Sequence, residues 1–97
     1  MREVNYGWII TRDNVEDGKH VGTMGPHNVT PAVADALSAG KGRAWRAYDD
    51  DGEWYYSGRY IDCPNGNEFA PLDNFAAPNA GATELRYRGD DGKWRAL

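Results

Sequence analysis

The chain has 97 residues, a formal net charge of −4 and a sequence pI near 5.0. This length allows one modest hydrophobic core, so we expect residues 1–97 to form a single domain. The acidic balance argues against broad nucleic-acid binding, which generally needs a basic surface. A single cysteine, Cys63, excludes an internal disulfide and agrees with a cytoplasmic location, and no apolar run is long enough to indicate a membrane segment.

The N-terminal part of the chain predicts a strand, an irregular connection that holds a second, short strand, and one helix. The first strand is expected at Asn5–Thr11 and the short strand at His20–Thr23. The helix is expected at Pro31–Ala39, because Thr30 is a natural N-cap and proline suits the first helical position. Gly40 then stands where a left-handed residue commonly ends a helix.

Two aromatic-rich runs between Arg43 and Ile61 flank the sequence Asp-Asp-Asp-Gly at 49–52, which predicts a β-hairpin. A two-residue turn and a type I turn followed by a glycine bulge both fit these four residues. The similar sequence at 89–92 lies in a second predicted hairpin, Thr83–Leu97. There the bulged turn places Arg88 opposite Trp94 and avoids facing two arginines, so we favour it for both hairpins.

Between the hairpins, Phe69–Phe75 is expected to form one helical turn begun by Pro71, with Phe69, Leu72 and Phe75 pointing inward at a spacing of three. The small residues at 76–82 are interpreted as a loop. The whole chain then predicts an α+β fold: about five antiparallel strands, including two β-hairpins, with one short helix packed on one face. The order of the strands in space does not follow from the sequence.

Several stretches of the chain resemble a family of small uncharacterised proteins of actinobacteria and their bacteriophages. The resemblance lies in the segments Gly7–Thr11, Val21–Pro26, Tyr48–Arg59, Pro71–Phe75 and Pro78–Gly81. It implies a cytosolic protein of bacterial or phage origin. The family has no known activity, so the resemblance implies no catalytic residue.

The residues that commonly hold metals or perform catalysis do not form an informative pattern. Asp49, Asp51 and Glu53 alternate as in the start of a calcium loop, but the glycine and the final glutamate of an EF-hand are missing. His20, His27 and Cys63 are too few and too irregularly spaced for a zinc site. We therefore expect no metal and no cofactor. A small hydrolase-like enzyme built around His27, Asp73 and Cys63 is kept as the least favoured function.

The most informative feature is an excess of arginine and aromatic residues along both hairpins. Because strand side chains alternate between faces, both faces of the first hairpin carry aromatic rings, and one helix cannot cover both. Such a composition is typical of protein interfaces, of stacking platforms for single-stranded nucleic acid or sugars, and of small β-rich cores. The residues concerned are Arg43, Arg46, Arg59, Arg86, Arg88 and Arg95 with Trp45, Tyr48, Trp54, Tyr55, Tyr56, Tyr60, Tyr87 and Trp94.

We favour a non-enzymatic protein–protein interaction module, in its most specific form a phage-encoded modulator of a host protein. An aromatic and arginine surface is expected to bind the partner, and acidic turns at its rim are expected to meet basic groups. An alternative is a small-ligand or single-stranded nucleic-acid binding domain with Trp45, Tyr55 and Arg59 as the stacking platform. The protein is expected to be a monomer, or a homodimer paired through an exposed edge strand at Arg95–Leu97. The candidate binding residues are Trp45, Tyr48, Trp54, Tyr55, Arg59, Arg88 and Trp94, and the acidic turns contain Asp49, Asp50, Asp51, Asp90 and Asp91.

Overall fold

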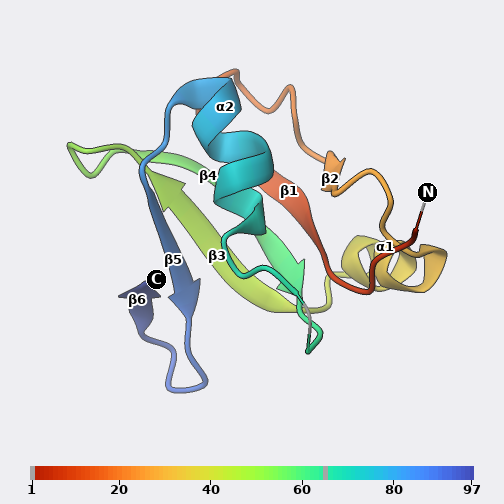
Figure 1. Ribbon diagram of the computed structural model, residues 1–97. Coiled ribbons are helices and arrows are strands. Elements are labelled where there is room, and N and C mark those ends of the chain that lie inside the picture. The colour runs from red at the N-terminus through yellow and green to blue at the C-terminus, as the bar shows by residue number, and fades with distance from the viewer. Residues whose placement is uncertain (1, 65) are drawn as a thin grey trace.

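The computed structural model describes residues 2–64 and 66–97 and has one six-stranded antiparallel sheet with the order β2-β1-β4-β3-β5-β6 (Figure 1). The predicted α+β class is confirmed, with six strands in place of about five. Neighbouring strands in this order are hydrogen-bonded, so β4 and β3 lie at the centre and β2 and β6 at the edges. The strands are β1 (Gly7–Asp13), β2 (Met24–Gly25), β3 (Arg43–Tyr48), β4 (Trp54–Ile61), β5 (Glu84–Arg88) and β6 (Trp94–Ala96).

Both hairpins have the predicted turn, a type I turn followed by a glycine bulge. Gly52 donates to the Asp49 carbonyl at 3.1 Å, and Gly92 donates to the Gly89 carbonyl at 3.0 Å. The φ angles of the two glycines are +79° and +80°, in the left-handed region that favours glycine. Arg88 pairs with Trp94 across the second hairpin, as predicted. Short-range turn chemistry was therefore sufficient to predict both turns and the pairing of Arg88 with Trp94.

The predicted helix is α1 (Pro31–Ser38), which begins and ends close to its expected bounds. The hydroxyl of Thr30 accepts a hydrogen bond from the Val33 amide, and Gly40 has a φ of +83°. A Cβ on Gly7 would lie 3.4 Å from Leu37 Cδ1. Gly7 shares its face of the sheet with Ile9, so α1 packs on that face, at the beginning of β1.

The opposite face is covered by a second helical segment, of which the sequence predicted only the first turn, begun by Pro71. It consists of η1, a π-helix (Leu72–Ala76), which continues directly into α2 (Ala77–Ala80) in front of the sheet in Figure 1. The prediction of a loop at 76–82 was wrong, because the small residues allow the helix to approach the sheet closely: Ala76 is completely buried. The inward orientation predicted for Phe69 was also wrong, since 44% of this residue is exposed.

The connection from β1 to β2 differs from the expectation too. The predicted strand at His20–Thr23 is replaced by turns, and the short strand β2 follows it. The carboxylate of Asp13, which is 5% exposed, holds this connection by accepting hydrogen bonds from three backbone amides. Hydrogen bonds to the buried carboxylate at the end of β1, rather than a strand at His20–Thr23, thus hold this connection in place.

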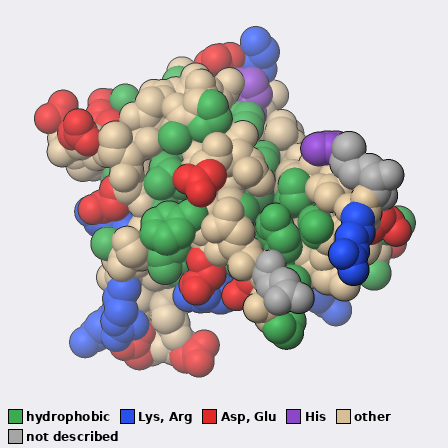
Figure 2. Space-filling model, in the orientation of Figure 1, with side chains coloured by type: hydrophobic (Ala, Val, Ile, Leu, Met, Phe, Trp, Pro, Cys, Tyr) green, Lys and Arg blue, Asp and Glu red, His purple; other side chains and the backbone are tan. Residues whose placement is uncertain are grey.

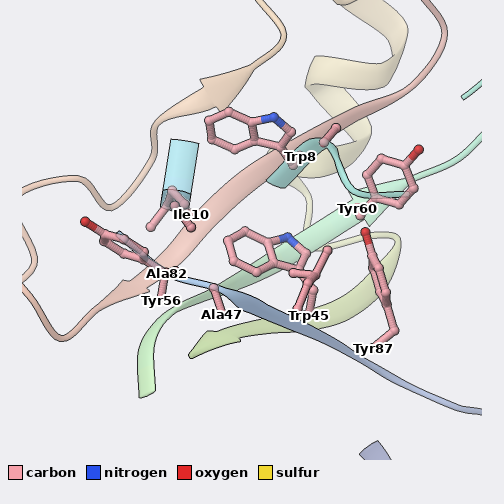
Figure 3. Close-up of a cluster of buried hydrophobic side chains, with 11 residues drawn as sticks. Trp8, Ile10, Trp45, Ala47, Tyr56, Tyr60, Ala82 and Tyr87 are labelled. Carbon is pink, nitrogen blue, oxygen red and sulfur yellow. The ribbon is translucent and has the colours of Figure 1, made fainter. Parts of the chain in front are cut away.

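The hydrophobic core lies between the sheet and the segment η1–α2 (Figure 3). Trp45, Tyr56 and Tyr60 are completely buried, and their polar groups have partners: Trp45 Nε1 donates to the Arg59 carbonyl at 3.0 Å, and Tyr60 donates to Asp62 at 2.9 Å. Aromatic residues therefore supply most of the volume of this small core without leaving these polar tips unsatisfied. Within residues 2–64 and 66–97, no helix is long and apolar enough to cross a membrane.

Candidate interaction surface

The face of the sheet opposite η1–α2 is covered by α1 only at one end, where α1 contacts β1 and β4, and the remainder carries arginine and aromatic side chains. We call this remainder the arginine–aromatic face. It brings together residues from five strands and from both hairpins. The residues that define it are Arg12, Arg46, Tyr48, Trp54, Arg59, Arg86, Arg88 and Trp94.

A β-bulge turns Arg12 onto this face. Ile10 is buried in the core, and in a regular strand Arg12 would point to the same side. The register of β1 and β4 shifts after Ile10, so Thr11 is the extra residue and Arg12 lies opposite Ser57. The shift places Asp13 opposite the core residue Tyr56. Arg12 and Asp13 consequently occupy opposite faces of the sheet.

A second register shift turns Trp54 onto the same face. Tyr56 belongs to the core, and without the shift Trp54 would share its side. The shift lies between Ala47 and Tyr48 and pairs Tyr48 with Trp54, which leaves Tyr55 as the extra residue. Trp54 Nε1 then donates to the Tyr56 carbonyl at 3.0 Å, which anchors the indole in this position.

The guanidinium groups and rings of this face stack on one another across the strands. Arg12 lies 4.6 Å from the centre of the Trp54 ring, and Arg46 lies 4.3 Å from the same ring. Arg46 also lies 4.2 Å from the ring of Trp94, so its guanidinium contacts two tryptophans. Arg86 makes a fourth such contact on this face, with Tyr48 at 4.2 Å. These cation–π contacts fix the arginine side chains in defined positions.

The arginine–aromatic face is basic although the chain as a whole is acidic. Among the residues described, Arg46 and Arg88 have no carboxylate within 4.0 Å, whereas Arg86 is paired with Glu84. A hollow of about 320 Å³ opens here, and neither aspartate nor glutamate is among the described residues that line it. Figure 2 shows the other side of the molecule, where acidic groups lie among hydrophobic side chains and Lys and Arg lie mainly at the outline.

The acidic turns lie at opposite ends of this face, because β3 and β5 are antiparallel and each runs into one turn (Figure 1). Hydrogen bonds from the Glu53 amide and from the Tyr55 hydroxyl help to lower the pKa of Asp49 below its usual value. The Arg95 guanidinium lowers the pKa of Asp91 to about 2. Both carboxylates thus serve the structure of their own turns, while Asp51 and Asp90 remain exposed.

The structure distributes the sequence-predicted binding residues over two faces. Trp54, Arg59, Arg88 and Trp94 lie on the arginine–aromatic face, together with Tyr48, of which only 8% is exposed. Trp45 instead belongs to the core, so its ring has no free side on which a ligand could stack.

Tyr55 packs at the margin of the core and donates to Asp49 at 3.2 Å. Of the three residues of the predicted stacking platform, only Arg59 therefore reaches the arginine–aromatic face.

Sequence reasoning missed Arg12, because a regular alternation along β1 places it on the wrong side of the sheet. The predicted arginine-rich set did contain Arg46 and Arg86, but it did not separate them from Arg43 and Arg95, which lie on the other face. Alternation within each hairpin was the only signal in the sequence for this difference in face. Pairing across the strands shows which arginines share a face.

The residues of the enzyme alternative are not gathered into one described pocket. His27 lines a hollow with Trp8 and Asn74, whereas Cys63 lines a different one beside Tyr6. Asp73 is exposed on η1. In the part of the chain that the structure describes, no group of three His, Cys, Asp or Glu side chains is placed to hold a metal ion.

Comparison of the chain with protein-family models, with curated proteins and with solved structures finds no match.

Proposed function

We propose that this protein is a non-enzymatic protein-interaction module that binds its partner through the arginine–aromatic face. One observation carries the proposal: the guanidinium of Arg46 lies between two tryptophan rings on an uncovered sheet face and has no carboxylate partner among the described residues. Arginine and tryptophan are the residues most enriched among the energetic centres of protein interfaces.

The rigidity of this face supports a binding role. Side chains that are already ordered lose less conformational entropy when a partner binds, so more of the interaction energy appears as affinity. Here the stacked rings of Trp54 and Trp94 order Arg46 before any partner arrives. Exposed ion pairs such as Arg95–Asp91 are instead satisfied within the chain and contribute little to association.

A nucleobase platform receives less support from the same contacts. Arg12 and Arg46 both lie over the ring of Trp54, so a base that stacked there would compete with guanidinium groups already in place. The specific version of the proposal, in which a phage-encoded protein modulates a host protein, depends on the family resemblance and is tested by the source of the partner.

The test is affinity capture from an actinobacterial lysate with three forms of the tagged protein, followed by mass spectrometry. The first is the natural chain, and the second is the double variant Arg46→Gln and Arg88→Gln. The third is Arg43→Gln with Arg95→Gln, which removes the same charge from the same strand pairs on the opposite face. We expect the natural chain and the third form to enrich the same partner, and the second form to lose it.

Two results would contradict the proposal. One is capture of the same partner, at the same yield, by the form that lacks Arg46 and Arg88. The other is the absence of any enriched protein in repeated captures at low salt. Thermal unfolding of all three forms, followed by circular dichroism, verifies that each is folded before the captures are compared.

A further inference from the structure

The hollow on the arginine–aromatic face has an unbalanced set of charges. Four arginines line it, Arg12, Arg46, Arg59 and Arg88, and neither aspartate nor glutamate is among its described lining residues. The hydroxyl-bearing residues Thr11 and Ser57 also line it. Guanidinium groups are strong, directional donors to carboxylate and phosphate oxygens. The natural occupant of such a hollow is therefore anionic.

The stacking leaves the hydrogen-bonding edge of Arg46 available. A guanidinium that lies flat against a ring interacts through its face, whereas its N–H groups radiate in its own plane. Arg46 makes ring contacts with Trp54 and Trp94, and within residues 2–64 and 66–97 its guanidinium forms no hydrogen bond. Arg88 is exposed and pairs with Trp94 across the second hairpin. The two arginines thus line the same hollow beside Trp94 and can address neighbouring anionic groups.

The charges around the face favour a short anion over a long one. The Asp-rich turns at 49–52 and 89–92 lie at its two ends, and the exposed side chains of Asp51 and Asp90 add negative charge there. A polyanion that extended beyond the face would meet this charge, and it would also be repelled by the net charge of −4. A segment confined to the face avoids the charge of the turns, and it carries fewer charges for the net charge to repel. The strand β5 has 5 residues, so a peptide of about five to seven residues, roughly 17–24 Å when extended, spans the face.

We propose that the partner presents a short acidic polypeptide segment to this face and that its carboxylates bind Arg46 and Arg88 within the hollow. This inference rests on the proposed function and specifies the chemistry of the partner. It reverses the expectation that acidic turns meet a basic partner, because the face that carries the ordered arginines is basic. The acidic turns then act as boundaries that disfavour long polyanions.

The experiment measures binding of fluorescein-labelled heptaglutamate by fluorescence anisotropy at low and moderate salt. Heptalysine and an oligothymidylate of the same charge as heptaglutamate are the comparison probes. We expect heptaglutamate to bind more tightly than either comparison probe, and added salt to weaken its binding. Replacing Arg46 and Arg88 by Gln should weaken binding about tenfold or more, whereas the control pair Arg43→Gln and Arg95→Gln should change it less than twofold.

Failure of this inference is distinguishable from failure of the proposed function. If oligothymidylate bound more tightly than heptaglutamate, the occupant would be a nucleic-acid backbone and the inference would be overturned. The same holds if heptaglutamate neither bound nor competed with a partner whose capture depends on Arg46 and Arg88; the proposed function would then stand without it. If capture itself did not depend on these arginines, the proposed function would fail first.

Discussion

On the face of the sheet covered by η1–α2, Trp45, Tyr56 and Tyr60 are completely buried, whereas on the opposite face Trp54 and Trp94 stay partly exposed beneath arginines. Trp54 comes from the same hairpin as the three buried residues, and Trp94 comes from the second hairpin. The difference lies in what covers the rings. The helical segment η1–α2 covers the first group, which therefore forms the core. Arginine side chains cover the second group, which therefore forms a preorganised surface.

This contrast explains how an acidic chain can have a basic face. The net charge of −4 is a sum over the whole molecule, whereas binding responds to the local potential. Carboxylates concentrate in turns, where Asp49 and Asp91 accept backbone hydrogen bonds. Arginines concentrate on one side of the sheet. Overall charge therefore argues against non-specific nucleic-acid binding without excluding a specific anionic partner.

The largest expected effect distinguishes Trp45, in the core, from Trp54, on the arginine–aromatic face. Trp45→Ala should lower the free energy of unfolding by about 3–5 kcal/mol, because it leaves a cavity in the core. Trp54→Ala should lower it by only about 1 kcal/mol, since the ring is partly exposed and mainly loses contacts with arginines. Urea unfolding followed by circular dichroism measures both. Equal losses would mean that the arginine–aromatic face is as much a structural layer as the core.

A smaller effect is expected from the glycine beside the first bulge. A Cβ on Gly58 would lie 1.7 Å from the Ile9 carbonyl oxygen and 2.8 Å from Trp45 Cζ2. Gly58→Ala should therefore destabilise the chain by about 2–3 kcal/mol through overpacking, and should disturb the register that turns Arg12 outward. Urea unfolding measures the loss, with Ser57→Ala on the adjacent outward position as the control. A neutral Gly58→Ala variant would contradict the tight approach of β1 and β4.

The buried carboxylate of Asp13, on the face opposite Arg12, makes the stability of the fold depend on pH. Burial alone would raise the pKa of Asp13, but hydrogen bonds from the amides of Glu16, His20 and Val15 outweigh it and hold the pKa below its usual value of 3.8. A pKa lowered by folding contributes stability above pH 3.8, and this contribution is lost as the pH falls through the folded-state pKa.

Asp13→Asn should lower the free energy of unfolding by about 1–2 kcal/mol at pH 7, because the amide presents a single, uncharged acceptor oxygen. The variant should also lose part of the acid-dependent fall in stability. Urea midpoints at pH 7 and pH 3 measure both effects. Asp35→Asn on the exposed side of α1 is the matched control. A similar loss of stability in that variant would contradict the assignment of the effect to the hydrogen bonds that Asp13 accepts.

Local chemistry was sufficient for several parts of the fold. The turns at Gly52 and Gly92 and the capping of α1 by Thr30 were predictable, because each depends on residues close together in the chain. The exposed second face also followed from alternation alone. The helical turn begun by Pro71 was also predictable, but its continuation through residues 76–80 was not, because that part depends on packing of the helical segment against the sheet.

The candidate site was only partly predictable, for a related reason. The sequence indicated an arginine and aromatic surface on the hairpins, and the structure brings three of its candidate residues, Trp54, Arg88 and Trp94, together there. It assigned Trp45 to the same surface and omitted Arg12. One extra residue in a strand reverses the side on which every later side chain lies, and such a bulge leaves little trace in a local pattern.

By itself, the sequence determined the antiparallel α+β class, both hairpin turns and the excess of arginine and aromatic residues, because these features depend on local conformational preferences and composition. The tertiary structure alone decided the strand order, the face covered by η1–α2 and the stack of Arg46 between Trp54 and Trp94. These arise from contacts between residues far apart in the chain. Such contacts depend on the register of each strand and on which face of the sheet is buried.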